Sequence, residues 1–373
     1  MVVPGRYEAI DDVARSMARQ VLEPAVTAAE PEGEFPESVW DQLADAGLTG
    51  VGVPTDLGGI AADRFARTLV YERLGHAHLA VSTALSVHDL ATTCLTSAND
   101  DGAWDDLLRS MAGGRPVGAF SLSEPQAGSD PSAIRTVARP VEDGYEITGE
   151  KLWVTNGRRA DLVVLFARTP DVDGGITQFL VPADAAGFSP GPPLEKLGLR
   201  ASDTTALDLD EVSVPESHRL TPIGDGLAAA FDALAGGRIS IAAQSVGLAQ
   251  AAIDETRASL TATDRNVKAS EHARHTLAEM STRVAAARSL TRDAARVADA
   301  GEDARYVASR AKLFASETAV WVTRNAIDLH GQIGYTTSRP VERYYRDARV
   351  TTIYEGTSQI QRMILARELL GRE

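Results

Sequence analysis

Pro116-Val117-Gly118-Ala119-Phe120-Ser121-Leu122 marks the point at which the chain changes its pattern of apolar residues. Before this stretch apolar residues recur about every 3.6 positions, which indicates helices, and after it about every second position, which indicates strands. At least five short segments rich in β-branched or aromatic residues follow, and they span 117–122, 145–155, 161–168, 176–181 and 206–212. Strands at this spacing without an intervening helix predict an antiparallel sandwich or barrel.

The segments on either side of this β region have helical periodicity. Apolar residues keep a helical spacing from Tyr7 to about Gly113, and again in three long stretches at 227–260, 269–297 and 304–330. Long helices with short connections favour an antiparallel bundle. We therefore predict an α+β fold that is mostly helical, with an N-terminal helical domain at 1–115, a middle β domain at 116–222 and a C-terminal helix bundle at 223–373.

Composition excludes several classes of protein. The 373 residues include 37 basic and 52 acidic ones, a net charge of −15, which argues against nucleic acid or an anionic membrane as the main partner. Cys94 is the only cysteine, so no disulfide framework or cysteine-based zinc site can form. His76, His78 and His88 are interpreted as packing or hydrogen-bonding groups, and no metal site is expected. We expect no apolar run long enough to span a membrane and no apolar signal core, and therefore a soluble, cytoplasmic protein.

A second stretch near the C-terminus, Ile353-Tyr354-Glu355-Gly356-Thr357-Ser358-Gln359-Ile360-Gln361, contains the candidate catalytic residue. Gly356 and Thr357 predict a turn, and the helical spacing of the residues after it places Glu355 just before a helix. A carboxylate there, beside Ile353 and Tyr354, would be partly desolvated, which raises its pKa toward that of a general base. The alternative is that Glu355 only interacts with the helix dipole.

Two segments of the β region could bind a cofactor. In Phe120-Ser121-Leu122-Ser123-Glu124-Pro125-Gln126-Ala127-Gly128-Ser129-Asp130 a strand ends in a hydroxyl-rich turn, which suits a ring carbonyl or a phosphate but is also common in surface turns. In Lys151-Leu152-Trp153-Val154-Thr155-Asn156-Gly157 the side chains of Trp153 and Thr155 point the same way on a strand. That pair suits a flat heteroaromatic ring, although an indole can equally cap a core. The two commonest glycine-rich nucleotide motifs are absent from the sequence.

Four motifs in order along the chain closely resemble the acyl-CoA dehydrogenase family. They are the Ser121–Asp130 and Trp153–Gly157 segments, Lys196-Leu197-Gly198-Leu199-Arg200-Ala201-Ser202-Asp203-Thr204, and Ile353–Gln361. The resemblance extends from about Tyr7 to Glu368. It implies an N-terminal helical domain, a middle β domain and a C-terminal four-helix bundle, the order that the periodicity predicts independently.

The resemblance also implies a reaction, a cofactor and a set of site residues. Such enzymes use FAD to desaturate an acyl-CoA between Cα and Cβ, and by this likeness Glu355 takes the α-proton while flavin N5 accepts the hydride. The Glu355 N–H would help to stabilise the thioester oxygen. Positions matching FAD-binding ones are Phe120, Leu122, Ser123, Gly128, Ser129, Trp153, Thr155, Thr357 and Gln359. Those matching acyl-CoA-binding ones are Ser129, Arg238, Tyr354 and Gly356.

Some positions depart from the family pattern. A minority of family members carry the catalytic base at a different position, and the matching residue here is Gly237. Glycine has no carboxylate, so Glu355 is the only candidate base of the two positions. A loop that reaches FAD in a neighbouring subunit is shorter and lacks its Phe-Gly at Arg265–Ala269, and a Gln-x-x-Gly-Gly turn with the same role reads Asp328-Leu329-His330-Gly331-Gln332. An acidic residue near a pyrophosphate should weaken its binding. We therefore expect either weak FAD binding in a homo-oligomer (dimer or tetramer) or pairing with a different family member.

Partner and substrate stay open at this level. An electron-transfer flavoprotein is the expected electron acceptor. Alternatives are an oxidase, a dehydrogenase of carrier-protein thioesters, and a non-catalytic subunit of a heteromer. The small residues Gly236, Gly237, Ala242 and Ala243 are similar to those of short- and branched-chain members, so a short or branched acyl group is favoured.

Overall fold

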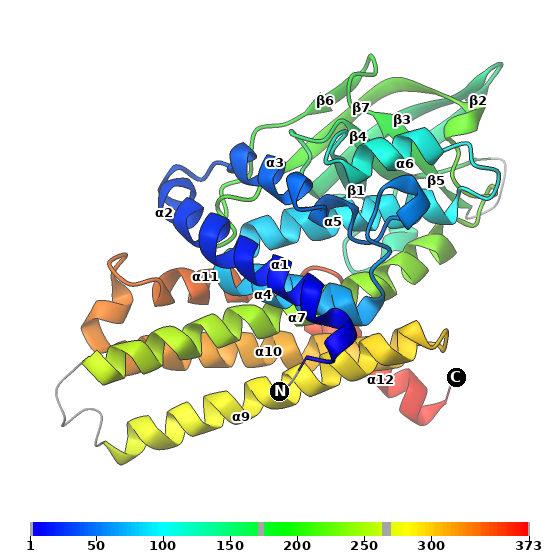
Figure 1. The fold of residues 1–373 in the computed structure, drawn as a ribbon. Coiled ribbons are helices and arrows are strands. Elements are labelled where there is room, and N and C mark those ends of the chain that lie inside the picture. Colours follow the sequence, from blue (N-terminus) through cyan, green and yellow to red (C-terminus); the bar gives the residue numbers. More distant parts are fainter. Residues whose placement is uncertain (1–2, 171–174, 263–269, 372–373) are drawn as a thin grey trace.

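The computed structural model describes residues 3–170, 175–262 and 270–371, and it confirms a mostly helical α+β fold. A seven-stranded sheet lies at one end of a body of helices (Figure 1). The N-terminal helices are α1 (Glu8–Met17), α2 (Glu23–Glu32), α3 (Glu37–Asp45), α4 (Arg64–Ala77), α5 (Leu79–Ser97) and α6 (Asp105–Ala112). The C-terminal helices are α7 (Gly226–Ala262), α9 (Glu271–Asp299), α10 (Arg305–His330), α11 (Val341–Thr351) and α12 (Ser358–Leu370).

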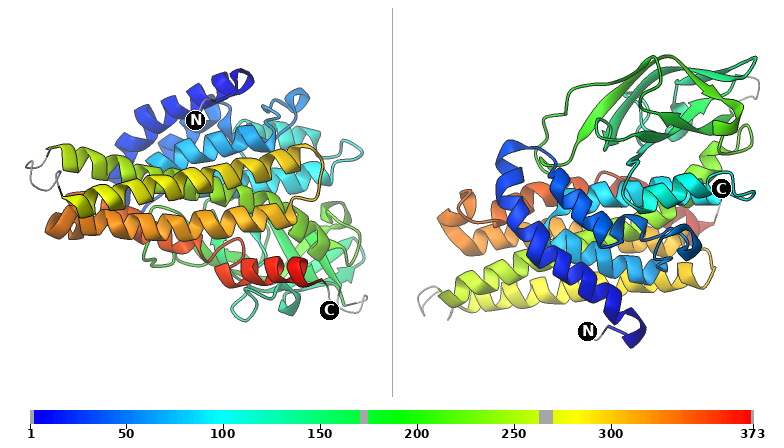
Figure 2. Two further views of the ribbon diagram at one scale, coloured as in Figure 1. Left: turned by 90° about the horizontal axis from the view of Figure 1, so that it is seen from below. Right: turned by 45° about the horizontal axis from the view of Figure 1, so that its top comes forward.

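Helix α7 is the centre of the helical body. It packs against α4, α5, α9, α10 and α11, and α7, α9 and α10 run side by side in both views of Figure 2. Two glycines allow α4 and α7 to approach closely: a Cβ at Gly75 would lie 2.8 Å from the Gln244 carbonyl oxygen, and one at Gly247 only 2.1 Å from that of Glu72. The sequence expectation of no span-length apolar run was too strong, since α7 is long and apolar enough to cross a membrane. More than half of that window is buried within the protein, as in a core helix of a bundle.

The sheet is mixed and curled. Its strands are β1 (Gly118–Ser121), β2 (Val137–Val141), β3 (Gly144–Thr155), β4 (Leu162–Arg168), β5 (Ile176–Pro182), β6 (Phe188–Pro190) and β7 (Thr204–Pro215). They are paired in the order β1-β4-β2-β3-β7-β6, with β5 on β4. The five predicted strands are present, but β1 and β2 each run parallel to β4, so the purely antiparallel arrangement was wrong. The β2–β3 hairpin lies between β1 and β4 in the chain and supplies the long connection that a parallel pair needs.

Strands β2 and β6 were not predicted from the sequence. Strand β2 is mostly exposed and includes Pro140, and β6 has three residues and ends at Pro190. Neither has the alternation of buried and exposed residues on which strand prediction depends. Both lie beside long β strands, β2 against β3 and β6 against β7, so pairing with a neighbour determines their conformation.

The N-terminal helices and the sheet are joined by buried polar contacts. The Gly118 N–H donates to His88 Nδ1 at 3.0 Å, and His88 Nε2 lies 3.1 Å from the Met111 carbonyl oxygen, which it can reach only as a donor. Burial lowers the pKa of His88 to about 4, so the ring is neutral. The interpretation of this histidine as structural agrees with these contacts.

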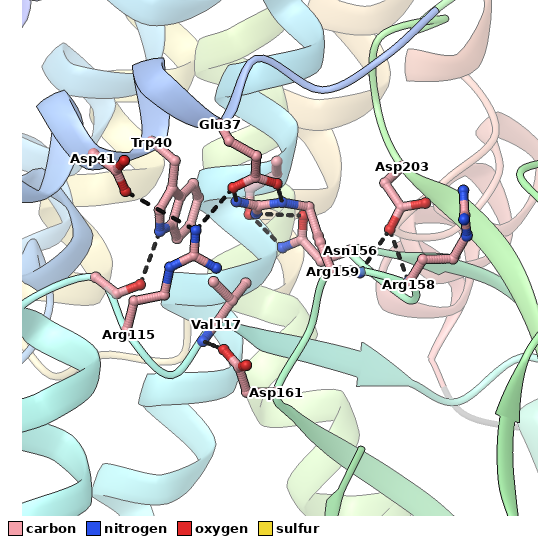
Figure 3. Close-up of polar contacts among 12 residues, drawn as sticks. Glu37, Trp40, Asp41, Arg115, Val117, Asn156, Arg158, Arg159, Asp161 and Asp203 are labelled. Atoms are coloured by element: carbon pink, nitrogen blue, oxygen red, sulfur yellow. Dashed lines mark hydrogen bonds and ion pairs between the residues drawn. The ribbon is translucent and has the colours of Figure 1, made fainter. Parts of the chain in front are cut away.

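A second junction is formed by Arg159, which follows β3 (Figure 3). Its guanidinium donates to both carboxylate oxygens of Glu37 on α3 at 2.8 Å and lies over the rings of Phe35 and Trp40, at 4.0 and 4.4 Å from their centroids. A bidentate pair that also stacks on aromatic rings is favourable for arginine. The end of β3 is therefore fixed to the N-terminal helices.

Candidate active site

Glu355 lies in a tight turn between α11 and α12. Glu355 has a φ of 54° and Gly356 one of 88°, both left-handed. This conformation costs a residue other than glycine roughly 1–2 kcal/mol, and such strain collects at functional sites. Thr357 ends the turn as the N-cap of α12, since its Oγ1 accepts the Ile360 N–H at 3.3 Å. The predicted position of Glu355, just before a helix, agrees with the structure.

The Glu355 carboxyl has the environment of a poised base. Its Oε2 atom is buried and has no hydrogen-bond partner. Burial raises its pKa to about 7, although Arg238 and Lys312 oppose the rise by their positive charge. A carboxyl that only interacted with the helix dipole would stay exposed with a low pKa. This group can accept a proton near neutral pH.

Glycine at position 237 makes room for this carboxyl. A Cβ on Gly237 would lie 2.6 Å from Glu355 Oε2, closer than side-chain carbons come to other atoms. The position that the resemblance gives as the alternative site for the base therefore lies directly beside Glu355. Its neighbour Gly236 faces the Arg64 guanidinium instead, and Ala242 and Ala243 are buried in the main core. Of the four small residues singled out in the sequence, these contacts place only Gly237 against the carboxyl.

Arg238 and Tyr354 surround Glu355. The Arg238 side chain is buried on α7, its Nε has no partner, and burial lowers its pKa while Glu355 raises it. Tyr354 Oη donates to Gln244 Oε1 at 3.4 Å, and burial raises the pKa of this phenol. A buried guanidinium with a free N–H beside an acidic group is available to a bound anionic or carbonyl group.

A buried ion pair supports the hydroxyl-rich turn after β1. Lys151 Nζ lies 2.8 Å from Glu124 Oε1, and both side chains are almost fully buried. Glu124 also accepts the N–H groups of Arg135 and Thr136. Burial raises the pKa of Glu124 but these partners lower it further, to about 2. The Leu152 N–H donates to the Ser123 carbonyl oxygen at 2.9 Å, so the two candidate cofactor segments lie side by side.

Trp153 is held in an unusual conformation beside this turn. A β-bulge interrupts the β3–β7 register between Lys151 and Val154, and Trp153 there has a φ of 64°. Its side chain is 61% exposed while Val154 is 1% exposed, and Thr155 is again partly exposed. The indole therefore does not cap a core. The ring is open to solvent, and Trp153 and Thr155 are both more exposed than Val154 between them.

The other predicted residues of β1 and the hydroxyl-rich turn after it differ in their exposure. Phe120 and Leu122 pack partly against a core cluster between the sheet and the helices. Gly128 and Ser129 are exposed at the tip of the turn, and a Cβ at Gly128 would meet no atom within 4 Å. Open space around this tip leaves room for a ligand.

The third motif connects the sheet to the helix that precedes Glu355. Asp203 accepts the Asn156 N–H through its backbone oxygen at 2.7 Å and the N–H groups of Arg158 and Arg159 through its carboxylate (Figure 3). The Leu199 N–H donates to Asp347 Oδ1 on α11 at 2.6 Å. The Trp153 strand and the Glu355 turn are thus connected through one loop.

Thr357 and Gln359 line a hollow of about 260 Å³ at the start of α12, between that helix, α11 and Glu317 of α10. Ser358 also lines it, and its buried Oγ has no partner. A helix N-terminus with a free hydroxyl favours a phosphate or another anion. Together with the open indole of Trp153, these groups are compatible with the FAD that the motifs imply.

Of the two segments that depart from the family pattern, only Asp328–Gln332 lies among the described residues. The Arg265–Ala269 segment lies outside the described residues. The Asp328–Gln332 segment spans the end of α10 and the start of the 3-10 helix Gly331–Tyr335, and Asp328, Gly331 and Gln332 are exposed. An exposed position at a helix end is available to a neighbouring subunit.

Two buried contributors, Lys312 and Gln361, were not predicted from the sequence. Lys312 lies on α10 and Gln361 on α12, and both side chains are fully buried. A lysine next to the buried Ala311 was the available signal, because lysine is almost never fully buried without a partner. Among the described residues no cluster of His, Cys, Asp and Glu could hold a metal ion.

Comparison with known proteins extends these observations. Three family models match the chain in order: the acyl-CoA dehydrogenase N-terminal domain at residues 6–115, the middle domain at 119–212 and the C-terminal domain at 224–370. An acyl-CoA dehydrogenase of Bacillus subtilis is 37% identical over 365 residues, 96% of this chain and 96% of that protein.

Solved structures agree with the family models. Butyryl-CoA dehydrogenase from Megasphaera elsdenii is 31% identical, with a TM-score of 0.96 over 99% of each chain. A chain from a structure of the electron transferring flavoprotein of Acidaminococcus fermentans is 33% identical, with a TM-score of 0.97 over 100% of this chain and 99% of that one. The resemblance inferred from the four motifs is confirmed.

Proposed function

Because this chain belongs to the acyl-CoA dehydrogenase family of FAD-dependent oxidoreductases, we propose that it desaturates an acyl-CoA thioester with Glu355 as the base. The observation that carries this proposal is the Glu355 carboxyl, which has a buried, unpartnered Oε2 and a pKa raised to about 7 by burial. A base needs a pKa near the working pH to take a proton efficiently. The three predicted domains, 1–115, 116–222 and 223–373, would each contribute to the site.

In the proposed reaction the Glu355 carboxylate takes a proton from Cα. The Glu355 N–H makes no hydrogen bond within the described part of the chain, so it is free to donate to the thioester oxygen, where negative charge develops as the proton leaves. Bound FAD would supply the acceptor for the hydride that leaves Cβ. The positive charge of the buried Arg238 would favour the ionised carboxylate, and the strained turn would orient this N–H.

The residues proposed to hold the two ligands are those predicted from the sequence. Ser123, Trp153 and Thr155 would contact the flavin ring, and Phe120, Leu122, Gly128 and Ser129 would lie nearby. Thr357 and Gln359 would contact the anionic part of FAD. Ser129, Arg238, Tyr354 and Gly356 would contact acyl-CoA. This assignment is supported by the open Trp153 indole and the hollow at the start of α12.

A short or branched acyl group is the proposed substrate. Support comes from the likeness to a butyryl-CoA dehydrogenase and from Gly237, which leaves no side chain between α7 and the Glu355 carboxyl. The test is to add acyl-CoAs of increasing length anaerobically and to follow the loss of flavin absorbance. Bleaching fastest with short or branched acyl groups supports the proposal, and bleaching fastest with long straight chains contradicts it.

The proposed electron acceptor is an electron-transfer flavoprotein, in the cytoplasm. The likeness to a chain in the Acidaminococcus fermentans structure supports this choice. The alternative is an oxidase or a dehydrogenase of carrier-protein thioesters. Reoxidation of the reduced enzyme by air distinguishes an oxidase, which turns over in air alone, from a dehydrogenase, which needs the flavoprotein.

The chain is proposed to work as an oligomer, as members of its family do. Apolar side chains at one end of the molecule support this: Met363 is 49% exposed and Leu370 is 86% exposed on α12. Asp328 is exposed at the end of α10, where a negative charge would oppose an incoming pyrophosphate. We therefore keep both a homo-oligomer with weak FAD and a heteromer with another family member. Measuring the flavin content per subunit of the purified chain tests both: a homo-oligomer that retains one FAD per subunit would contradict both.

A further inference from the structure

Two buried side chains bind the backbone of the Glu355 turn. Lys312 Nζ donates to the Gly356 carbonyl oxygen at 2.7 Å. Gln361 Nε2 donates to the carbonyl oxygens of Glu355 and Gly356 at 3.1 and 3.0 Å. The Gly356 carbonyl oxygen is therefore bound from two helices, α10 and α12, and the Glu355 carbonyl oxygen from α12 alone.

This arrangement is costly unless it has a role. The side chains of Lys312 and Gln361 are both 0% exposed, and Gln361 Oε1 has no partner. Burial lowers the pKa of Lys312 to about 8, although Glu355 raises it. Burying the Lys312 ammonium group and the Gln361 amide loses hydration that the two carbonyl groups of the turn do not fully replace. Apolar residues at these two positions would pack in the core at lower cost if the turn needed no support.

The bonds fix the direction of the Glu355 side chain. Glu355 and Gly356 both have left-handed backbones, a conformation that glutamate leaves readily when it is not constrained. Because a peptide unit is planar, holding the Glu355 carbonyl fixes the rotation next to the Cα that carries the carboxyl. The carboxyl then stays in the gap beside Gly237, where Oε2 is buried.

We propose that Lys312 and Gln361 are positioning residues for the reaction, holding the Glu355–Gly356 turn so that the carboxyl meets the substrate α-carbon, with Lys312 also acting on the carboxyl by its charge. This inference rests on the proposed role of Glu355 as the base. The two residues contribute differently, because Lys312 carries a charge and Gln361 does not.

Three groups from neighbouring helices act electrostatically with Glu355. Arg238 on α7 and Lys312 on α10 favour the carboxylate. Burial raises the pKa of the Cys94 thiol on α5, and the charge of Glu355 adds to that rise. Removing Lys312 leaves Arg238 as the only cation among these three. The pKa of Glu355 should then rise, since an opposite charge nearby lowers a carboxyl pKa by about 1–3 units.

The experiment compares Lys312→Met and Gln361→Met, which keep side-chain length and remove the donors. The control is Thr323→Val, further along α10, where the hydroxyl bonds only to its own helix. Two quantities are measured: the limiting rate of anaerobic flavin reduction by butyryl-CoA, and the titration of the Glu355 carboxyl by infrared difference spectroscopy, with Glu355→Gln identifying its band.

We expect both methionine variants to lower the limiting rate by roughly 10- to 100-fold, because displacing a reacting group by about 1 Å can reduce the rate by as much. The butyryl-CoA concentration for half-maximal rate should change little. Lys312→Met should also raise the titration midpoint of Glu355 by about one unit, and Gln361→Met should leave it in place. The Thr323→Val control should match the wild type in both measurements.

Wild-type rates in both methionine variants, with Glu355→Gln inactive, would overturn this inference and leave Glu355 as the base. A fully active Glu355→Gln would instead overturn the proposed function itself. If Lys312→Met does not fold, Gln361→Met decides alone: a wild-type rate there contradicts the positioning role, and a reduced rate with an unchanged Glu355 titration supports it.

Discussion

Replacing Gly237 by alanine should separate catalysis from stability in this protein. The added Cβ would lie 2.6 Å from Glu355 Oε2, whereas ordinary contacts begin at 3.4 Å, so the carboxyl oxygen must retreat by about 0.8 Å. The atom in the way is the tip of a flexible side chain, so the helix itself can stay in place. We therefore expect the fold to be kept and the carboxyl to be displaced.

The two effects have opposite signs. A displacement of nearly 1 Å costs a reacting group roughly 100-fold in rate, which corresponds to about 2.7 kcal/mol in the activation barrier. Glycine in a helix interior is less stable than alanine by about 0.5–1 kcal/mol, so Gly237→Ala should unfold at the same or a slightly higher temperature. The assay is stopped-flow reduction of the flavin by butyryl-CoA, with thermal unfolding measured on the same sample.

Gly236→Ala is the matched control, because it adds the same methyl group to the same helix. Its Cβ would also lie 2.6 Å from a neighbour, but that neighbour is the Arg64 guanidinium. We expect this variant to keep its rate within about tenfold of the wild type. Equal losses of rate in the two variants, or a wild-type rate in Gly237→Ala, would refute the placement of the Glu355 carboxyl beside Gly237.

Three further predictions follow from the buried charges and from the segment at Asp328 that departs from the family pattern. Lys151→Met should lower the free energy of unfolding by about 3 kcal/mol, since it leaves Glu124 buried without its cation. The folded pKa of Glu124 is lowered to about 2, so the stability that Glu124 contributes is present above its usual pKa and is lost as pH falls toward 2. Urea unfolding at several pH values measures both effects. Burial raises the pKa of Asp347 to about 6, so the wild type should lose stability as pH rises through that value and Asp347→Asn should flatten this part of the curve. Asp328→Gln should increase the flavin retained per subunit on gel filtration if the negative charge weakens FAD binding, and an unchanged content would remove charge at Asp328 as the cause.

The pattern of apolar residues was sufficient to predict the order of helices, strands and helices. It also placed Glu355 before a helix, because Gly356 and Thr357 mark a turn regardless of what surrounds them. What it could not show was the pairing of β1 with β4 or the existence of β2 and β6, which depend on neighbouring strands rather than on their own residues.

The candidate site was only partly visible for a similar reason. Trp153 and Thr155 were placed on one side of β3, but the bulge that gives Trp153 its left-handed backbone follows from the β3–β7 register. Lys312 is 43 residues away from Glu355 in the sequence, and nothing local connects the two. Side chains that act through the backbone of another segment leave no motif of their own, so their role becomes visible only in three dimensions.

The most direct test of Glu355 as the base is the anaerobic mixing of wild type and Glu355→Gln with butyryl-CoA at pH 8, above the carboxyl pKa of about 7. Glutamine keeps the shape of the side chain but cannot take a proton. We predict rapid loss of flavin absorbance in the wild type and a rate at least about 100-fold lower in the variant, the lower end of what general base catalysis supplies. Equal rates in the two proteins would contradict the account.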